Sequence, residues 1–386
     1  MKIRVNTKSL REALKGFTGI VNAKSSVEIL QGVKIQTKDN QYITITGTDL
    51  EFFKTVNVPC EILEGGGFTT NLKVLQTWLK EIRSKEVMLE PITTNRYKVV
   101  SDSMNYMIEP HDLVDYPDAM PTEITDDKMN VDVTTLQDIY KKHSINTTSL
   151  HVDPAMHEPM TTKLSYICID IDGEIIATSC NGYMVVRTTH LIEQGAKKRL
   201  LIKPKSLKLL LRNVKGGNVE IGWNNDCFLV QTKDALMGLK LDIDVNYPEI
   251  PYEGCLEVRY RVIIKTDELR TALKSMAFLG GTNKRNYEDR KGYVDFIFKE
   301  NKLELVGTTC YEEEPVIEAL LSLNNNIGNR EIRLNPVFVL NALDSLDNGT
   351  DSLEFVLYEG ETSVSLKNTK GDFAMIMTIR KDEDED

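Results

Sequence analysis

The residue types that most often carry out chemistry in proteins occur in this sequence without the spacing that such chemistry needs. The five histidines form no HExxH, and no two cysteines form a CxxC pair. Buried free thiols therefore explain the cysteines better than a metal or redox centre does. Asp49 and Asp170 could act as acids, but an aspartate in a turn usually bonds to its own backbone. The six cysteines are Cys60, Cys168, Cys180, Cys227, Cys255 and Cys310.

Motifs for phosphate binding and nucleophilic catalysis are also missing. The sequence contains no Walker loop, no GxSxG and no GxGxxG. The glycines at 65–67 precede Phe68 and are not followed by Lys-Ser or Lys-Thr, so we interpret them as a turn. The sequence therefore predicts no catalytic site, no metal site and no cofactor.

The basic residues follow a pattern that the net charge hides. The net charge of −11 argues by itself against a nucleic-acid partner. However, five of six predicted helices carry Lys or Arg beside an apolar face. If these helices line one surface, that surface attracts a phosphate backbone through counterion release, without reading the bases. The predicted DNA-facing residues are Lys8, Arg11, Lys15, Lys73, Lys80, Arg83, Lys141, Lys142, Lys205, Lys208, Arg212, Arg270 and Lys274.

The helices that position these residues are predicted from capping residues and from apolar residues at helical spacing. They begin near Lys8, after Asn71, after Thr134, at Pro204, after Thr266 and at Pro336. In the first helix Leu10, Leu14 and Phe17 share one face. The sixth helix differs, because its exposed charges are Asp344 and Asp347.

Strand and turn patterns recur along the chain with one long period. The strand that ends at Asp49 resembles those that end at Asn181 and Cys310, which lie 132 and 129 positions apart (181 − 49; 310 − 181). The Tyr-Pro pairs that begin at Tyr116 and Tyr247 are 131 positions apart (247 − 116). A period of this length predicts three similar domains, 1–124, 125–253 and 254–386. Each is an α+β domain made of a duplicated strand, helix and three-strand unit.

Bulk properties fit an ordinary soluble protein. A length of 386 residues with 41% hydrophobic content supports two or three domains with real cores. No run of residues approaches the length of a membrane span, and the first residues read as a strand. We therefore expect a cytoplasmic protein.

These features, spread over the whole chain, resemble the bacterial-type β sliding clamp, the processivity subunit of the replicative DNA polymerase. The resemblance rests on residues 27–30 together with residues 46–51, and on residues 115–117, 247–248, 335–336 and 375–380. It implies that two chains form a head-to-tail ring of six domains, with helices inside and sheets outside. Such a ring encloses duplex DNA, is opened by an ATP-driven loader and catalyses nothing itself. The resemblance also places Lys24 in a basic loop that contacts DNA.

The resemblance further implies a hydrophobic cleft that binds short peptides from the polymerase and other partners. A surface rich in Met and aromatic residues suits such a site. Thr378 replaces a Pro that is usual in the family, and Tyr183 and Met184 stand where His and Arg are common. The predicted cleft consists of Leu164, Gly182, Tyr183, Met184, Val185, Pro248, Phe338, Met377, Ile379 and Arg380.

Two further expectations follow from the resemblance. Tyr106 and Ile108 of one chain would meet Phe278 and Leu279 of the other where the ring closes. The chain also continues past Arg380 into the acidic residues 381–386, where family members normally stop. We interpret this segment as a solvating tail, with the alternative that it screens acidic peptides from the cleft.

Two other functions stay open on the sequence alone. One is a clamp-shaped scaffold that binds peptides and never encircles DNA. The other is a β-rich enzyme whose site has no recognisable motif. Loading onto circular DNA separates the clamp from the scaffold, and turnover of any substrate would favour the enzyme.

Overall fold

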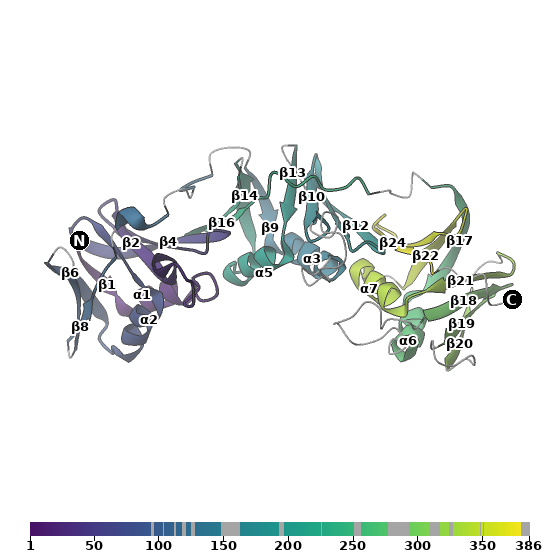
Figure 1. Cartoon of the computed structure of the whole chain (residues 1–386), viewed down its shortest axis with the longest axis horizontal. Helices are drawn as coiled ribbons and strands as arrows, with labels where there is room; N and C mark the ends of the chain where they lie inside the picture. Colours follow the sequence, from purple (N-terminus) through teal and green to yellow (C-terminus); the bar gives the residue numbers. More distant parts are fainter. Residues whose placement is uncertain are drawn as a thin grey trace. The chain divides into compact units, whose positions relative to one another are not determined.

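The computed structural model, whose helices and strands are labelled in Figure 1, divides into two compact units, and the segments of the two units alternate along the chain. Unit 1 contains Met1–Leu136 and Lys205–Asp244, and unit 2 contains Gln137–Pro204 and Val245–Asp386. Each unit is therefore built from two separate segments. The structure describes residues 1–93, 96–102, 104–111, 113–117, 121–124, 128–147, 163–192, 197–224, 226–250, 256–276, 293–308, 317–323, 327–347, 349 and 351–379.

Unit 1 is built on one antiparallel sheet. Its main path runs β8-β7-β6-β1-β4-β16-β15-β14-β9, and β2, β3 and β5 attach beside β4. Buried and exposed residues alternate along β1, as expected where one face of a sheet packs against a core. The strands are β1 (Lys2–Asn6), β2 (Gly32–Lys38), β3 (Tyr42–Thr48), β4 (Phe52–Glu64), β5 (Gly67–Asn71), β6 (Glu86–Thr93), β7 (Arg96–Val100), β8 (Asn105–Ile108), β9 (Met129–Asp132), β14 (Asn218–Trp223), β15 (Cys227–Gln231) and β16 (Ala235–Lys240).

The helices of unit 1 begin at the predicted caps. Asn6 accepts hydrogen bonds from the backbone of Lys8 and Ser9 at 3.0 and 3.1 Å, which fixes the start of α1 (Thr7–Lys15). Asn71 does the same for α2 (Leu72–Glu81) through Val74 at 3.2 Å. The two helices lie side by side (Figure 1). α5 (Pro204–Asn213) begins at the border of the unit, and the border passes through α3 (Val133–His143).

The sheet of unit 1 is continuous because β4 pairs with β16, although the two strands are far apart in the sequence. Gly238 of β16 stands opposite Phe53 of β4, 185 positions earlier (238 − 53). A Cβ atom at Gly238 would lie 2.1 Å from the Phe53 ring, which is buried with Leu229 and Leu236. Only a residue without a side chain allows this ring to cover the strand.

We therefore expect Gly238→Ala to lower the unfolding free energy by about 1–3 kcal/mol, through overpacking. Urea unfolding of the variant measures the loss. The double variant with Phe53→Leu should lose less than the sum of the two single variants, because Leu vacates the space. Additive losses would show that the ring contact is not the cause.

Unit 2 contains two antiparallel sheets. The first runs β13-β10-β11-β12-β24-β23-β22-β17, and the second runs β20-β19-β18-β21. The pairing of β12 with β24 joins the two segments of the unit. The strands are β10 (Ile167–Ile171), β11 (Glu174–Cys180), β12 (Met184–Leu191), β13 (Lys198–Ile202), β17 (Val258–Lys265), β18 (Tyr293–Lys299), β19 (Lys302–Thr308), β20 (Ile317–Ser322), β21 (Arg330–Leu334), β22 (Ser352–Tyr358), β23 (Ser363–Lys367) and β24 (Phe373–Met377).

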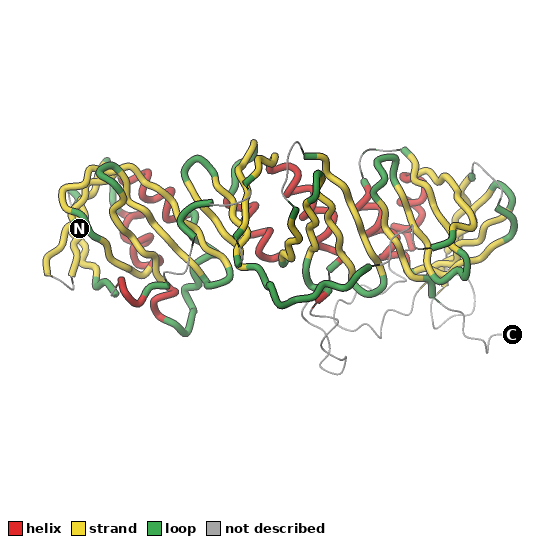
Figure 2. Tube along the Cα trace, turned by 90° about the horizontal axis from the view of Figure 1, so that it is seen from above, coloured by secondary structure: helices red, strands yellow, loops and turns green. Residues whose placement is uncertain are grey.

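The helices α6 (Thr266–Met276) and α7 (Pro336–Leu346) pack side by side against these sheets (Figure 2). Asn335 caps α7 by accepting from the Val337 backbone at 2.9 Å, and Pro336 occupies its first turn. The large core of the unit includes Leu269 and Leu273 of α6 and Val339 and Leu343 of α7.

The α+β fold class and the presence of the six predicted helices are confirmed. The predicted start after Thr134 is wrong, because α3 begins at Val133 and the Thr134 backbone N–H donates to Asp132 at 2.7 Å. Phe17, predicted in the first helix, lies beyond its end at Lys15. Before β2, which begins at Gly32, Glu28–Gln31 form the 3₁₀-helix η1. Two further 3₁₀ segments lie where the sequence predicts no helix, η2 (Leu113–Asp115) and η3 (Ser144–Asn146). The three domains 1–124, 125–253 and 254–386 stay a prediction. Among the described residues, no helix is long and apolar enough to cross a membrane.

Candidate functional site

The predicted turn acids are structural. Asp49 accepts hydrogen bonds from the backbone of Glu51 and Phe52 at 3.1 and 2.7 Å. Asn181 accepts equivalent bonds from Tyr183 and Met184 at 3.0 and 2.8 Å. Both side chains therefore close turns between strands, which is the simpler of the two interpretations for Asp49. Asp170 accepts two hydrogen bonds from the Arg199 guanidinium, at 2.6 and 3.1 Å.

The basic residues on α1 and α2 are exposed. Arg11 also links α1 to α2, because its guanidinium donates hydrogen bonds to the carbonyl oxygens of Leu79 and Ile82 at the end of α2. Lys15 and Lys80 occupy the last turns of their helices, where positive charge also favours the helix dipole. The other exposed basic residues of these helices are Lys8 and Lys73. Arg83 is exposed just after the end of α2, and Lys24 is exposed in a turn between α1 and η1.

The basic residues of α5 are exposed as well: Lys205, Lys208 and Arg212. Beside them, unit 1 contains a buried lysine that the sequence did not reveal. Lys54 of β4 is 7% exposed and donates to Asn213 at 2.9 Å, above the Phe17 ring at 5.6 Å. Burial, and next the charge of Lys215, lower the pKa of Lys54. Lys54 therefore links β4 to α5 and presents no charge to solvent.

The prediction that Lys142 and Arg270 face DNA is wrong. Lys142 is 3% exposed and forms ion pairs with Asp138 at 2.8 Å and Asp372 at 3.8 Å. The Arg270 side chain is 16% exposed and pairs with Asp344 of α7 and with Asp347, which directly follows α7. Their charges are compensated inside unit 2, so neither offers a free cation to a phosphate. The neighbouring residues Lys141 and Lys274 are exposed.

Part of the predicted cleft forms an exposed apolar cluster in unit 2. Tyr183 is 42% exposed, and its ring stacks on Phe338 of α7 with the centroids 5.8 Å apart. Met377, 52% exposed, donates its backbone N–H to the Tyr183 carbonyl at 2.9 Å. Ile379 is 39% exposed and bonds through its backbone to Arg333. Gly182 makes the turn possible with φ of +91°.

The remaining cleft residues lie elsewhere in unit 2. Leu164 and Met184 are 6% and 1% exposed, so both are wrong as surface residues. Met184 and Val185 point to opposite faces of β12 because strand side chains alternate. Val185 and Pro248 line a separate cavity of about 500 Å³, and Arg380 lies outside the described residues. The other residues of this cavity are Cys168, Asp170, Thr178, Arg187, Arg199, Tyr247, Glu249, Ile250 and Phe373.

The groups in this cavity do not suit nucleophilic chemistry. Burial, followed by the charge of Asp170, raises the pKa of the Cys168 thiol to about 12. The thiol is therefore protonated near neutral pH, and a protonated thiol is a weak nucleophile. Burial also raises the pKa of Tyr247. Within the described part of the chain, no group of three or more His, Cys, Asp or Glu side chains is arranged to hold a metal ion.

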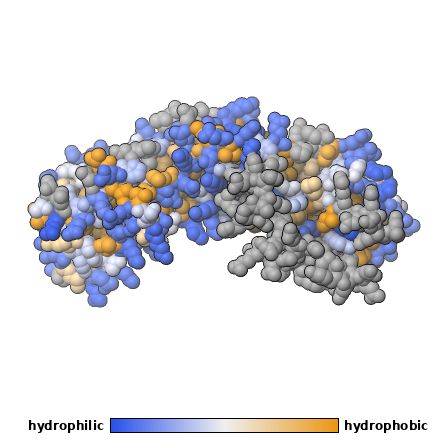
Figure 3. All heavy atoms as spheres, viewed as in Figure 1, coloured by the Kyte–Doolittle hydropathy of each residue, from blue (hydrophilic) through white to orange (hydrophobic). Residues whose placement is uncertain are grey.

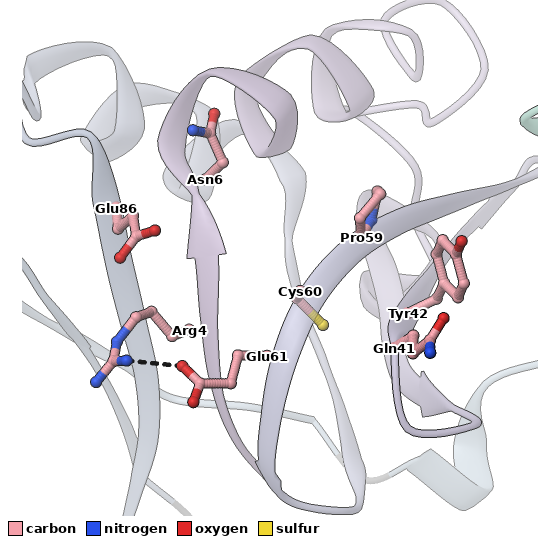
Figure 4. Close-up of a pocket in the computed structure, with 8 residues that line it drawn as sticks. All are labelled: Arg4, Asn6, Gln41, Tyr42, Pro59, Cys60, Glu61 and Glu86. Atoms are coloured by element: carbon pink, nitrogen blue, oxygen red, sulfur yellow. Dashed lines mark hydrogen bonds and ion pairs between the residues drawn. The ribbon is translucent and has the colours of Figure 1, made fainter.

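A second, more open cavity of about 430 Å³ lies in unit 1 (Figure 4). Arg4 of β1 and Glu61 of β4 line it and form an ion pair of 2.7 Å, and Cys60 directly precedes Glu61 on β4. Burial raises the pKa of Cys60. The face of unit 1 shown in Figure 3 is mostly hydrophilic, with small apolar areas between polar side chains. Neither feature indicates a catalytic site.

The predicted contact between two chains is only partly described. Tyr106 of the edge strand β8 stacks on Trp78, with the ring centroids 5.3 Å apart. Ile108 is 1% exposed, so it belongs to the core of unit 1 and has almost no surface to bury against a second chain. Met107 between them is 56% exposed. Phe278 and Leu279, like the acidic residues 381–386, lie outside the described residues.

Comparisons with known proteins agree with the resemblance. Residues 1–121 match the family described as DNA polymerase III beta subunit, N-terminal domain. The chain is 23% identical over 346 residues to a beta sliding clamp of Staphylococcus epidermidis, covering 87% of each chain. It resembles the DNA polymerase III subunit beta of Pseudomonas aeruginosa with a TM-score of 0.79 at 18% identity, over 99% of this chain and 100% of that chain. The sliding clamp of Bacillus subtilis gives a TM-score of 0.79 at 17% identity, over the same shares.

Proposed function

We propose that this chain, which has the β sliding clamp fold, is itself a sliding clamp that holds the replicative polymerase on duplex DNA and catalyses nothing. One observation carries the proposal: exposed cations recur on α1, α2, α3, α5 and α6 of a chain with a net charge of −11. Helix faces that carry exposed cations bind the phosphate backbone of any sequence. The acidic remainder of the chain repels DNA and confines it to those faces.

The active form we propose is a head-to-tail ring of two chains, opened by an ATP-driven loader in the cytoplasm. Two edge strands support this assembly. β8 ends the sheet of unit 1, and β20 ends the smaller sheet of unit 2. Both carry exposed apolar residues, Met107 at 56% and Leu320 at 61%. An edge strand of this kind is a template for pairing with another chain.

The partner site we propose consists of the exposed residues Tyr183, Met377 and Ile379 with Phe338, which is 8% exposed and stacks on the Tyr183 ring. We call these four residues the apolar cluster. An aromatic pair beside a flexible Met accommodates apolar side chains of different shapes. Short peptides with leucine or phenylalanine from the polymerase and the loader fit this chemistry.

The experiment that tests the function is loading onto nicked circular DNA with a clamp loader and ATP. A ring should stay on the circle through gel filtration and leave when the circle is cut once. Retention that survives cutting would indicate ordinary binding. No retention, with intact peptide binding, would favour a scaffold that never encircles DNA.

The helix lysines should set the salt dependence of DNA binding. We expect Lys73→Gln with Lys80→Gln to reduce the slope of log K against log salt by roughly 0.9 for each phosphate that the protein no longer neutralises. The matched control is Lys38→Gln with Lys240→Gln, since these exposed lysines lie on β2 and β16 of the same unit. Both variants change the net charge equally. Equal slopes for the two variants would show that DNA does not prefer the helices.

A further inference from the structure

A buried polar network joins the two segments of unit 2 beside the β12–β24 pair. Its centre is Asp372, 2% exposed, in the turn before β24. Asp372 accepts hydrogen bonds from the Thr189 backbone at 2.8 Å and from the Asn368 side chain at 3.1 Å. It also lies 3.8 Å from the ammonium group of Lys142 on α3. We call Lys142, Thr189, Asn368 and Asp372 the polar junction.

The polar junction continues the strand pairing where backbone bonds stop. The ladder of β12 and β24 runs from Met184, opposite Ile376, to Arg187, opposite Phe373. Beyond this ladder, the Thr189 backbone N–H donates to the Asp372 carboxylate, where a longer ladder would offer a backbone carbonyl. One end of this ladder therefore carries Tyr183 and Met377, and the other end is closed by a charged side chain.

The same network fixes α7, the helix that carries Phe338. Ser345 of α7 donates to the Lys142 carbonyl at 2.7 Å, and Asn146 donates to both at 2.8 Å. Asn368 donates to the Leu346 carbonyl at the end of α7 at 3.4 Å. Lys142, Asn146 and Ser345 are 3%, 0% and 0% exposed. The three elements that carry the apolar cluster are thus tied to one buried network.

Burying this network needs an explanation beyond stability. Moving a carboxylate and an ammonium group out of water costs several kcal/mol each, and apolar residues of similar volume often stabilise a core as well or better. The charged network adds directional contacts, because its hydrogen bonds and its ion pair link α3, β12, α7 and the turn before β24.

We propose that Lys142 and Asp372 are positioning residues of the partner site, which hold Tyr183, Phe338 and Met377 in the arrangement that binds a peptide. This inference rests on the proposed function of the apolar cluster. It also gives Lys142 a role that replaces the predicted contact with DNA.

Peptide affinity tests the proposal. The probe is a fluorescein-labelled peptide Ser-Leu-Ser-Leu-Phe-Ser, whose apolar residues suit the apolar cluster, in an anisotropy titration of the full chain. We expect Asp372→Asn and Lys142→Met each to weaken binding about tenfold, because each removes the buried charge pair of Lys142 and Asp372 that links α3 to the turn before β24. Lys142→Arg should keep affinity within about twofold, because it keeps the charge. Arg261→Met, which removes an exposed ion pair of the same unit with Glu354, should bind as the natural chain does.

A double variant separates positioning from general stability. Lys142→Met with Asp372→Leu removes both buried charges, so its melting temperature should recover towards that of the natural chain. A leucine side chain at position 372 cannot accept from Thr189 or Asn368, so we expect peptide binding to stay about tenfold weaker. Recovery of affinity together with melting temperature would overturn the positioning role. If the natural chain itself does not bind the probe, the proposed partner site fails, and this inference fails with it.

Discussion

Unit 2 is expected to lose about 2 kcal/mol of unfolding free energy when the pH falls from 7.5 to 5, because of one histidine. His143 is 0% exposed and bonds to the hydroxyl groups of Ser179 at 2.8 Å and Thr188 at 2.9 Å. Burial is the main cause that lowers the pKa of His143 to about 3, and the charges of His190 and Lys142 add to it.

The direction follows from proton binding in the two states. Between pH 6.5 and about 3 the unfolded chain binds a proton at His143 and the folded chain does not. Stability therefore falls as the pH falls through this window and is unaffected above it. Burial also lowers the pKa of His190, although Asp138 opposes the effect, so His190 acts in the same direction.

Urea unfolding at several pH values, followed by hydrogen exchange in unit 2, measures this loss. His143→Gln keeps hydrogen-bonding groups in the same place but cannot titrate, so its unfolding free energy should depend much less on pH. His111→Gln in unit 1 is the matched control and should keep the steep dependence. A parallel pH profile for His143→Gln and the natural chain would contradict the prediction.

Leu320→Lys is expected to turn the proposed two-chain ring into single chains. Leu320 lies on the edge strand β20 and is 61% exposed. Burying a leucine contributes about 1.5–3 kcal/mol, and a lysine on an edge strand opposes pairing. A ring of two chains has two such contacts, so the loss of binding free energy occurs twice in each ring. The dissociation constant should therefore rise by more than roughly a hundredfold.

Light scattering over a range of protein concentrations measures this change as a fall from two chain masses to one. Ile243→Lys is the control, because Ile243 is 67% exposed but lies in no strand. Met107→Lys on β8 should act like Leu320→Lys if the two edges pair with each other. An unchanged mass for both edge variants would remove β8 and β20 from the assembly.

Local signals in the sequence are sufficient for most of the fold. Asn6, Asn71 and Asn335 each cap a helix where the sequence places one. Asp49 and Asn181 close matching turns, which explains why the period of the chain is visible in such residues. These caps and turns are formed by residues within four positions of one another, so they can be predicted from the local sequence alone.

The misplaced site residues depend on partners far along the chain. Lys142 lies three positions after Ile139, on the apolar face of α3, and its partner Asp372 follows 230 positions later (372 − 142). The charge of Arg270 is compensated by Asp344 of α7. The sequence shows that this helix carries exposed acidic residues where the others carry Lys or Arg, but it does not show the reason. The periodicity of each helix predicts its apolar face, but pairing between helices cannot be read from either helix alone.

The interleaving of the two units has a consequence for synthesis on the ribosome. Unit 1 lacks β14, β15 and β16 until residue 244 has been made, although its first segment ends at residue 136. At roughly 5–20 residues per second, the intervening 108 residues (244 − 136) take on the order of 5–20 s. During that time the edge of β4 that later receives β16 has no partner in its own chain. Because an unpaired edge is a template for another chain, we expect low local concentration or a chaperone to favour correct folding of the nascent chain.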